Sequence, residues 1–255
     1  MSLLQFDEAT IKFGGLTALN AFSMSVERGT IHALIGPNGA GKSTAFNAVS
    51  RVYSLTSGRV LFDGKVISNE PPHSLARIGI SRTFQNIELC GRMTVLENVL
   101  IGMHSKIQSY NPFFPGLRRA KIESEAVRAA DELLERIGLL PFRDVKANEL
   151  DFGRQKMLDI ARALAGKPKM LLLDEPAAGL RNREIAALDG LLSELRKTEG
   201  ITILLVEHVM QLVMAIADKI TVLNFGTKIA EGPPQEVRRN PKVIEAYLGS
   251  GYAEA

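Results

Sequence analysis

The sequence predicts an α/β fold in which a parallel sheet is covered by helices on both faces. Two observations support this prediction: short, nearly continuous apolar runs end in polar turns, and helical patterns follow most of these runs. Strands of buried parallel sheets read as apolar runs, and helices usually connect them. The chain has 255 residues, of which 45% are hydrophobic. One domain with subdomains is therefore favoured over two independent domains.

The alternation of strands and helices can be followed along most of the chain. The predicted strands, each with the helix that follows it, are 30–36 with 42–52, 169–175 with 183–197, 201–208 with 209–218, and finally 219–226. Residues 57–68 depart from this pattern, because they alternate around an Asp63-Gly64 pair that is typical of a β-hairpin. With residues 3–13 they predict a small antiparallel layer.

A helical region follows at residues 94–138. Thr94 and Glu97 have the spacing of a capping box at a helix start. A charged amphipathic helix is predicted over 120–138, where Gly138 stops it. This region predicts a helical subdomain beside the sheet.

A loop at residues 109–117 carries two aromatic side chains, Phe113 and Phe114. Two interpretations remain open. The rings either pack onto the helical layer, which is the usual fate of loop aromatics, or contact a partner.

Composition excludes several classes of protein. Lys and Arg exceed Asp and Glu by 31 to 28, with no basic block, so a nucleic-acid partner is not expected. The single cysteine, Cys90, excludes an internal disulfide, and with four histidines it argues against a Cys/His zinc site. No secretory signal and no apolar run of about 18 residues is visible, so we expect a protein that is soluble or peripheral to a membrane.

Residues 36–44, GPNGAGKST, fit the phosphate-binding pattern G-x-x-x-x-G-K-[ST]. Glycines let successive backbone N–H groups curl around a phosphate, and the following helix adds its positive end. Lys42 is expected to reach the β- and γ-phosphates, and Ser43 to bind Mg²⁺. The residues predicted to contact the nucleotide here are Gly36, Pro37, Asn38, Gly39, Ala40, Gly41, Lys42, Ser43 and Thr44. This pattern predicts a nucleoside triphosphate site.

Two acids at the end of a buried strand supply the second half of such a site. In MLLLDE, Asp174 is expected to hold Mg²⁺ through its water shell, and Glu175 to orient or deprotonate an attacking water. A GTPase would need an Asn-Lys-x-Asp motif, which is absent, and a small-molecule kinase would need a lid and an acceptor site, which are not apparent.

Four further motifs occur in a characteristic order: FQN at 84–86, LDFGRQ at 150–155, LLLDEPAAGL at 171–180 and VEH at 206–208. With the phosphate loop, they make the chain resemble the ATP-binding subunit of ABC transporters from end to end. The resemblance implies that Gln85 reaches Mg²⁺ and senses a membrane subunit, that His208 contacts the γ-phosphate, and that Phe13 stacks on adenine. The catalytic residues would then be Glu175, His208 and Lys42. Mg²⁺ would be bound by Ser43, Gln85 and Asp174.

The resemblance also implies how the chain is divided. A P-loop NTPase (RecA-like) core with an antiparallel β layer would span 1–88 and 156–240. A helical subdomain carrying the signature loop would span 89–155, and a C-terminal tail 241–255. The signature loop closes over the ATP of the opposite protomer, and here its residues are Leu150, Asp151, Phe152, Gly153 and Arg154.

Longer stretches are similar to one subfamily. RTFQNIELCGRMTVLENVLIGMH, EPAAGL and VLNFGTKIAEGPPQEVRRNPKVIEAYLG resemble the longer ATPase subunit of branched-chain (hydrophobic) amino acid importers. The resemblance implies ATP and Mg²⁺ as cofactors and a head-to-tail dimer with itself or a second ATPase. It also implies two membrane permease subunits that dock near residues 86–92, an indirect substrate-binding protein, and a location on the cytoplasmic face of a prokaryotic cell membrane.

Two alternatives remain open from the sequence. One is an ABC ATPase for another cargo, such as urea or lipopolysaccharide, because these motifs do not identify the ligand. The other is an ABC-type regulatory protein that binds ATP without driving transport. Soluble ABC proteins of repair or translation usually carry two such domains or long coiled-coil insertions, neither of which is expected in this sequence.

The signature loop departs from the family pattern Leu-Ser-Gly-Gly-Gln. Asp151 stands at the serine position and Arg154 at the glutamine position, while Ala178 and Arg181 replace the serine and aspartate of the D-loop. An ionised aspartate accepts hydrogen bonds only and would repel a phosphate. Arg154 could bind phosphate itself or pair with Asp151. Alternatively, Asp151 simply favours the positive end of its helix.

Overall fold

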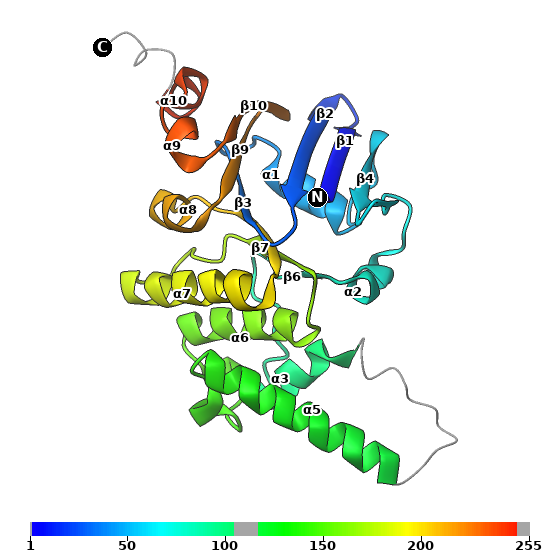
Figure 1. Ribbon diagram of the computed structural model, residues 1–255, viewed down its shortest axis with the longest axis vertical. Helices are drawn as coiled ribbons and strands as arrows, with labels where there is room; N and C mark the ends of the chain where they lie inside the picture. Colours follow the sequence, from blue (N-terminus) through cyan, green and yellow to red (C-terminus); the bar gives the residue numbers. More distant parts are fainter. Residues whose placement is uncertain (1, 105–116, 249–255) are drawn as a thin grey trace.

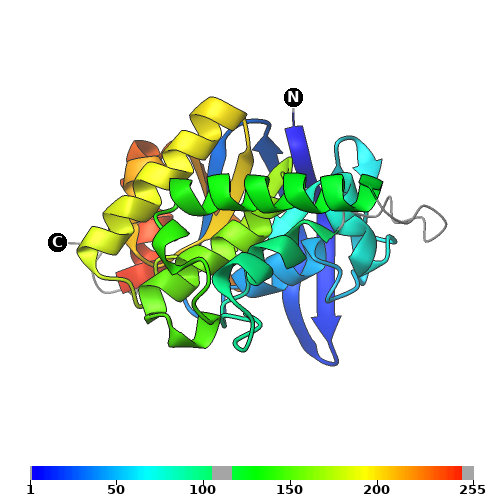
Figure 2. The same ribbon diagram turned by 90° about the horizontal axis from the view of Figure 1, so that it is seen from below.

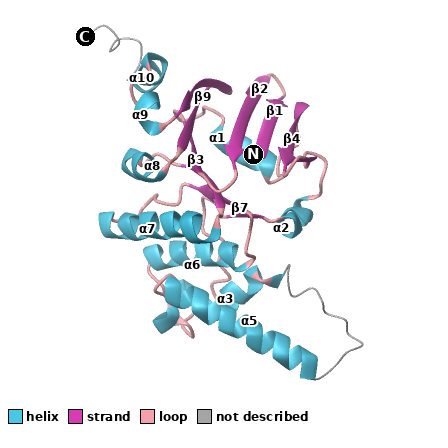
Figure 3. Cartoon of the chain, in the orientation of Figure 1, coloured by secondary structure: helices cyan, strands magenta, loops and turns pink. Residues whose placement is uncertain are grey.

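Two β-sheets and a layer of helices make up the part of the chain that the computed structural model describes, residues 2–104 and 117–248. Figure 1 and Figure 3 show the sheets in the upper half of the molecule and the helical layer below them. The predicted loop aromatics Phe113 and Phe114 lie outside the described residues.

The central sheet has six strands in the order β10-β9-β3-β8-β7-β6. Its strands are β3 (Ile31–Ile35), β6 (Ile80–Arg82), β7 (Met170–Asp174), β8 (Thr202–Val206), β9 (Lys219–Asn224) and β10 (Thr227–Gly232). Five of them pair in parallel, which confirms the predicted parallel sheet. The edge strand β10 pairs antiparallel with β9 and was not predicted, because its polar, short segment lacks an apolar run.

The second sheet is antiparallel, in the order β2-β1-β4-β5. Its strands are β1 (Ser2–Phe13), β2 (Leu16–Glu27), β4 (Ser57–Phe62) and β5 (Lys65–Val66). Asp63 and Gly64 both have positive φ, at 52° and 77°, as a type I′ hairpin turn requires. The predicted hairpin is therefore confirmed. Strand β2 was missed, although its second half alternates between buried and half-buried side chains.

Helices cover both faces of the central sheet (Figure 1). One face carries α1 (Lys42–Val49), which packs with the antiparallel sheet in a single cluster of buried apolar side chains. The helices whose side chains pack on the other face include α7 (Asn182–Glu199), α8 (Met210–Ile216), α9 (Pro234–Val237) and α10 (Pro241–Leu248). The helix predicted over 42–52 ends at Val49, because Arg51 takes a left-handed conformation with φ 61°.

The helical layer is built from α3 (Val95–Gly102), α5 (Leu117–Arg136) and α6 (Phe152–Ala165). Figure 2 shows this layer from below, with α5 crossing in front of the sheets. The described residues also include the short helices η1 (Pro72–Ser74), α2 (Leu75–Ile78), η2 (Leu140–Phe142) and η3 (Ala147–Glu149). The predicted capping box is present, since the Glu97 N–H donates to Thr94 Oγ1 at 3.1 Å and the Thr94 N–H donates to Glu97 Oε2 at 2.7 Å.

Helix α6 belongs to two apolar clusters at once. Its Leu158 and Ala161 pack within the helical layer, whereas Ile160 and Leu164 pack against the central sheet. The boundary placed between residues 155 and 156 from the sequence falls inside this helix. Helix α6 is therefore continuous between the helical layer and the sheet, and Leu133 of α5 also packs against both clusters.

The central strands end together at one edge of the sheet. Val206 of β8 pairs with Leu34 of β3 on one side and with Asp174 of β7 on the other. Because parallel strands in register end at the same edge, the loops that follow these three strands lie close together. This edge therefore positions the residues of the candidate active site.

The most deeply buried titratable side chain of the sheet is His32, which is fully buried in β3. Its Nε2 shares a 2.8 Å hydrogen bond with Thr221 Oγ1, whereas its Nδ1 has no partner among the described residues. Burial lowers the pKa of His32 to about 4, opposed by the charge of Glu231 and reinforced by Lys219 and Lys228. The folded protein thus holds His32 neutral.

We predict that acid destabilises the protein through His32. Between pH 6.5 and about 4 the unfolded chain binds a proton at this residue and the folded chain does not. The free energy of unfolding therefore falls as the pH is lowered through this window, by up to about 3 kcal/mol. Denaturant unfolding at several pH values measures this loss. His32→Gln should flatten the dependence, and the exposed His73→Gln should not; equal slopes in wild type and His32→Gln would contradict the prediction.

Candidate active site

The phosphate-binding loop lies between β3 and α1, where two glycines allow close packing. A Cβ at Gly36 would lie 2.1 Å from the Leu223 carbonyl oxygen, and one at Gly41 would lie 2.6 Å from that of Ala18. Gly41 also has a φ of 104°, which a side chain would strain. The loop is therefore held against β9 and β2 in a conformation that only glycine permits at these positions. Exposed loop residues are Asn38, Gly39 and Ser43.

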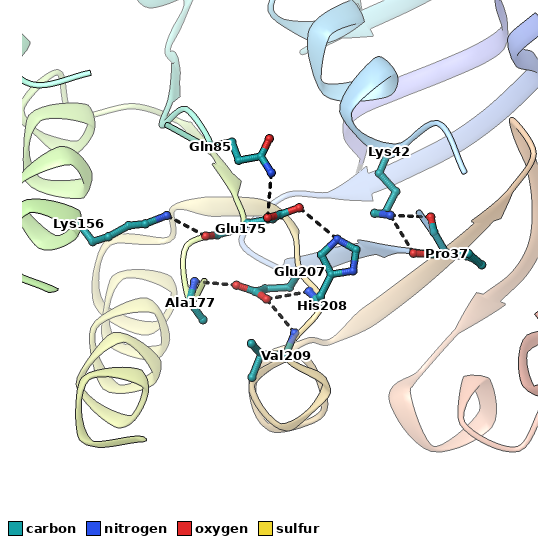
Figure 4. A network of polar contacts seen from close by, with 10 residues as sticks. Pro37, Lys42, Gln85, Lys156, Glu175, Ala177, Glu207, His208 and Val209 are labelled. Atoms are coloured by element: carbon teal, nitrogen blue, oxygen red, sulfur yellow. Dashed lines mark hydrogen bonds and ion pairs between the residues drawn. The ribbon is translucent and has the colours of Figure 1, made fainter. Parts of the chain in front are cut away.

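Lys42 begins α1 and its side chain folds back over the start of the loop (Figure 4). Its Nζ donates to the carbonyl oxygens of Gly36 at 2.8 Å and Pro37 at 2.9 Å. Burial lowers the pKa of Lys42, while the charges of Glu175 and Asp174 raise it. The ammonium group of Lys42 therefore lies close enough to both acids for an electrostatic interaction with them.

Asp174 ends β7 with a buried carboxylate. Its Oδ2 accepts a 2.7 Å ion-paired hydrogen bond from Arg82, which sequence reasoning did not single out. Its Oδ1 is buried and has no hydrogen-bond partner among the described residues. A buried carboxylate oxygen without a protein partner is costly, and oxygen is the ligand that Mg²⁺ prefers. The donor set at this position therefore fits a magnesium site.

Glu175 forms the centre of the polar network in Figure 4. Its Oε1 lies 3.1 Å from His208 Nε2, and its Oε2 accepts a 3.0 Å hydrogen bond from Gln85 Nε2. The structure thus brings together three residues that the sequence analysis singled out from distant segments. The backbone of Glu175 has a φ of 50°, which is uncommon for a residue with a side chain and often marks a functional site.

Lys156 of α6 joins this network from the helical layer. Its Nζ donates to the backbone carbonyl oxygen of Glu175 at 3.0 Å (Figure 4). Burial lowers the pKa of Lys156, and the charge of Asp159 is the largest influence that opposes this. The contact links the signature-loop helix to the loop after β7 within one chain.

Glu207 is a buried carboxylate that sequence reasoning missed. Its Oε1 accepts the Ala177 N–H at 2.7 Å, and its Oε2 accepts the N–H groups of His208 at 2.7 Å and Val209 at 2.9 Å. Three backbone donors compensate the buried charge. The side chain therefore fixes the loop that carries His208 against the loop that follows Glu175. The sequence contained one sign of this role, because Glu207 is an acid that directly follows the apolar run ITILLV.

Phe13 lies apart from this network, at the end of β1. Its ring packs edge-on against Tyr53, with 5.0 Å between ring centroids and 75° between ring planes. The side chain is 45% exposed, so an open aromatic face remains available on the antiparallel sheet.

The signature-loop residues form an ordinary helix start with local charge pairing. Asp151 is the N-cap of α6, and its Oδ1 accepts the Arg154 N–H at 2.9 Å. The Arg154 guanidinium pairs with the other oxygen and stacks on Phe142, 4.3 Å from the ring centroid. Two roles were possible for Arg154, binding phosphate or pairing with Asp151, and the structure contains the pairing with Asp151. Within the described residues, no side-chain hydrogen bond joins 150–154 to Lys42, Glu175 or His208.

The loop after Glu175 is packed against the signature loop. A Cβ at Gly179 would lie 2.7 Å from Phe152 Cε1, so the half-exposed Phe152 ring covers this loop. The Ala178 N–H donates to the Glu175 carbonyl oxygen at 3.2 Å, and the Arg181 N–H donates to Glu184 Oε2 at 2.7 Å at the start of α7.

Comparison with protein families agrees with this site. The model of the ABC transporter family matches residues 19–178, which include the phosphate loop, Asp174 and Glu175. A second family model, described as branched-chain amino acid ATP-binding cassette transporter, matches residues 227–253. In residues 2–104 and 117–248, no helix has both the length and the apolar character needed to cross a bilayer.

Curated relatives match almost the whole chain. The high-affinity branched-chain amino acid transport ATP-binding protein BraF of Pseudomonas aeruginosa is 42% identical, and LivG of Salmonella typhimurium is 44% identical; both alignments cover 97% of this chain and 98% of the relative. The probable LivG of Archaeoglobus fulgidus is 40% identical, and the alignment covers 100% of this chain and 98% of the relative.

Two solved structures show the same arrangement of elements. A nucleotide-free ATP-binding cassette from an ABC transporter superposes with a TM-score of 0.84 at 36% identity, covering 98% of this chain and all of that chain. A dimeric cassette bound to ADP and phosphate superposes with a TM-score of 0.77 at 27% identity, covering 91% and 99%.

Proposed function

The chain belongs to the ABC transporter family, and we propose that it powers an importer of branched-chain amino acids. Proteins of this family bind and hydrolyse ATP, and this chain is an ATPase of that kind. Two findings support this assignment of the cargo. The chain is similar over almost its full length to ATP-binding proteins of branched-chain amino acid transport, and residues 227–253 match a family model of the same description.

The observation that carries the hydrolytic role is the position of Glu175. Its carboxylate shares contacts with His208 and Gln85 at the sheet edge that also holds the phosphate loop. In this proposal Glu175 orients or deprotonates the attacking water and His208 contacts the γ-phosphate. Phosphoryl transfer needs positioning and charge neutralisation more than covalent chemistry. Lys42 and the N–H groups of the phosphate loop would position the phosphates and neutralise their charge. The exposed face of the Phe13 ring would stack on adenine.

Three oxygen-bearing side chains would hold Mg²⁺: Ser43, Gln85 and Asp174. The buried, unpartnered Oδ1 of Asp174 supports this, because a hydrated cation would satisfy it. When bound, the ion neutralises negative charge on the β- and γ-phosphates.

The partners follow from the same family. A related cassette is a dimer with ADP and phosphate, and we take a head-to-tail dimer, with itself or a second ATPase, as the working form of this chain. Two permease subunits would dock near residues 86–92, beside Gln85, with a substrate-binding protein acting through them. The chain would then lie on the cytoplasmic face of the membrane. In each dimer site, the signature loop at 150–154 of one protomer would cover the ATP of the other.

Glu175→Gln is expected to keep ATP binding but to cut turnover about 100-fold or more, on the scale of losing a positioned catalytic group. The amide keeps the size of the side chain and loses the base. ATP turnover and nucleotide affinity of the purified protein measure the two effects. Glu132→Gln, a matched change on the exposed face of α5, is the control. Near-normal turnover in Glu175→Gln would remove this residue from the role.

The cargo is tested by transport. Deleting the gene for this chain in its own cell should abolish uptake of radiolabelled leucine, isoleucine and valine through this system and leave urea uptake unchanged. The wild-type chain should restore uptake, and Lys42→Ala, which removes the charge expected at the phosphates, should not. Unchanged uptake of all three amino acids would contradict the proposal.

Asp151 should weaken the ATP site built on the partner's phosphate loop, since an ionised carboxylate faces phosphate there. Asp151→Ser keeps a good helix cap and removes the charge, so stability should change little. In a Glu175→Gln chain assembled with an unmodified partner ATPase, turnover comes from the partner-based site alone. Asp151→Ser in that chain is expected to raise it about two- to fivefold, the scale of one exposed charge interaction.

Asp151→Ala separates the loss of charge from the gain of a donor. It removes the charge and adds no hydrogen-bond donor, although it also loses the helix cap, at a cost of about 1 kcal/mol of stability. If neither variant changes turnover at the partner-based site, Asp151 is only a helix cap and the idea fails.

A further inference from the structure

Arg82 is a buried cation at the end of β6 that joins three elements of the core. Only 9% of its side chain is exposed. One terminal nitrogen donates to Asp174 Oδ2 at 2.7 Å, and the other donates to Asn47 Oδ1 and Ser50 Oγ, both at 2.8 Å. The guanidinium therefore connects the end of β7 with α1, the helix that follows the phosphate loop.

Two aromatic rings hold the guanidinium plane. Its central carbon lies 5.6 Å from the ring centroid of Phe46 and 5.1 Å from that of Phe84. Phe46 is fully buried in α1, whereas Phe84 is half exposed and directly precedes Gln85. Contacts on both terminal nitrogens and on the rings leave the guanidinium little freedom to turn.

The position of Arg82 decides which oxygen of Asp174 is free. Rotation of the carboxylate would exchange its two oxygens, but Arg82 engages Oδ2 from a fixed direction. Oδ1 is left buried without a partner among the described residues. A metal-binding carboxylate commonly needs a hydrogen-bonding neighbour that fixes its orientation in this way.

We propose that Arg82 is a positioning residue that orients Asp174 so that Oδ1 is presented to Mg²⁺. The inference rests on the proposed function, which assigns Asp174 to the metal. This role differs from that of a purely structural ion pair. A structural pair needs only an opposite charge beside Asp174, whereas orienting the carboxylate needs the planar guanidinium with its fixed N–H directions. Arg82 also ties this orientation to the Gln85 segment through Phe84.

Metal affinity without turnover tests this role. Mn²⁺ takes similar oxygen ligands and reports its own binding by electron paramagnetic resonance. In the full-length protein with saturating ADP, Arg82→Lys keeps the charge, so the chain should fold, but it loses the planar fork. We expect the Kd for Mn²⁺ to rise about 10- to 100-fold, the usual effect of losing a residue that orients a metal ligand. ADP affinity in EDTA should stay within about twofold.

Two further variants make each outcome decisive. Arg59→Lys changes an exposed arginine that pairs with Asp7 and should leave Mn²⁺ affinity unchanged. Asp174→Asn should lose the metal. Wild-type Mn²⁺ affinity in Arg82→Lys, with loss in Asp174→Asn, would overturn the role of Arg82 alone. Wild-type affinity in both would instead overturn the proposed metal site. A loss of ADP affinity in EDTA as large as the loss for Mn²⁺ would make Arg82 merely structural.

Discussion

The site depends on one constraint, the in-register parallel pairing of β8 between β3 and β7. Val206 pairs with Leu34 and with Asp174, so the three strands end at one level. The Glu175 N–H then donates to the Val206 carbonyl oxygen at 2.9 Å, one residue beyond the last strand pair. A left-handed backbone at Glu175 turns the chain there, and its side chain can meet His208 from the neighbouring strand. Register in the sheet therefore fixes the relative positions of Glu175 and His208.

Buried charged side chains add to the apolar packing of Ala177 and Val209 in holding the loops at this edge. Glu207 binds three backbone N–H groups, and Arg82 binds Asp174. Such arrangements contribute little net stability, because desolvating the ions offsets their attraction, but they accept only one geometry. Apolar packing would tolerate small displacements of the loops. An active site needs its groups held within a fraction of an ångström, and charged hydrogen bonds supply that restriction.

The sequence predicted the parts of this molecule that depend on local patterns. Apolar runs identified the parallel strands β3, β7, β8 and β9, Asp63-Gly64 identified the hairpin, and the phosphate loop identified the nucleotide site. Strands β2 and β10 escaped prediction because their pairing depends on distant partners. Arg82 and Glu207 escaped because a charge beside an apolar run normally reads as a solvated strand end. Only the fold places their partners, α1 and the loop after Glu175, within reach.

Helix α6 connects the signature loop with the loop that follows β7. It begins at the signature loop, which would serve a partner, and its Lys156 donates to the Glu175 carbonyl oxygen of its own chain. The same helix packs in both the helical layer and the central sheet. Sliding α6 relative to β7 must therefore stretch the Lys156 hydrogen bond or move the backbone of Glu175 with it. Asp151 caps this helix and Arg154 lies in its first turn, so both are joined to Lys156 through the helix backbone. A displacement of the signature loop would therefore be transmitted through α6 to the backbone of Glu175 in the same chain.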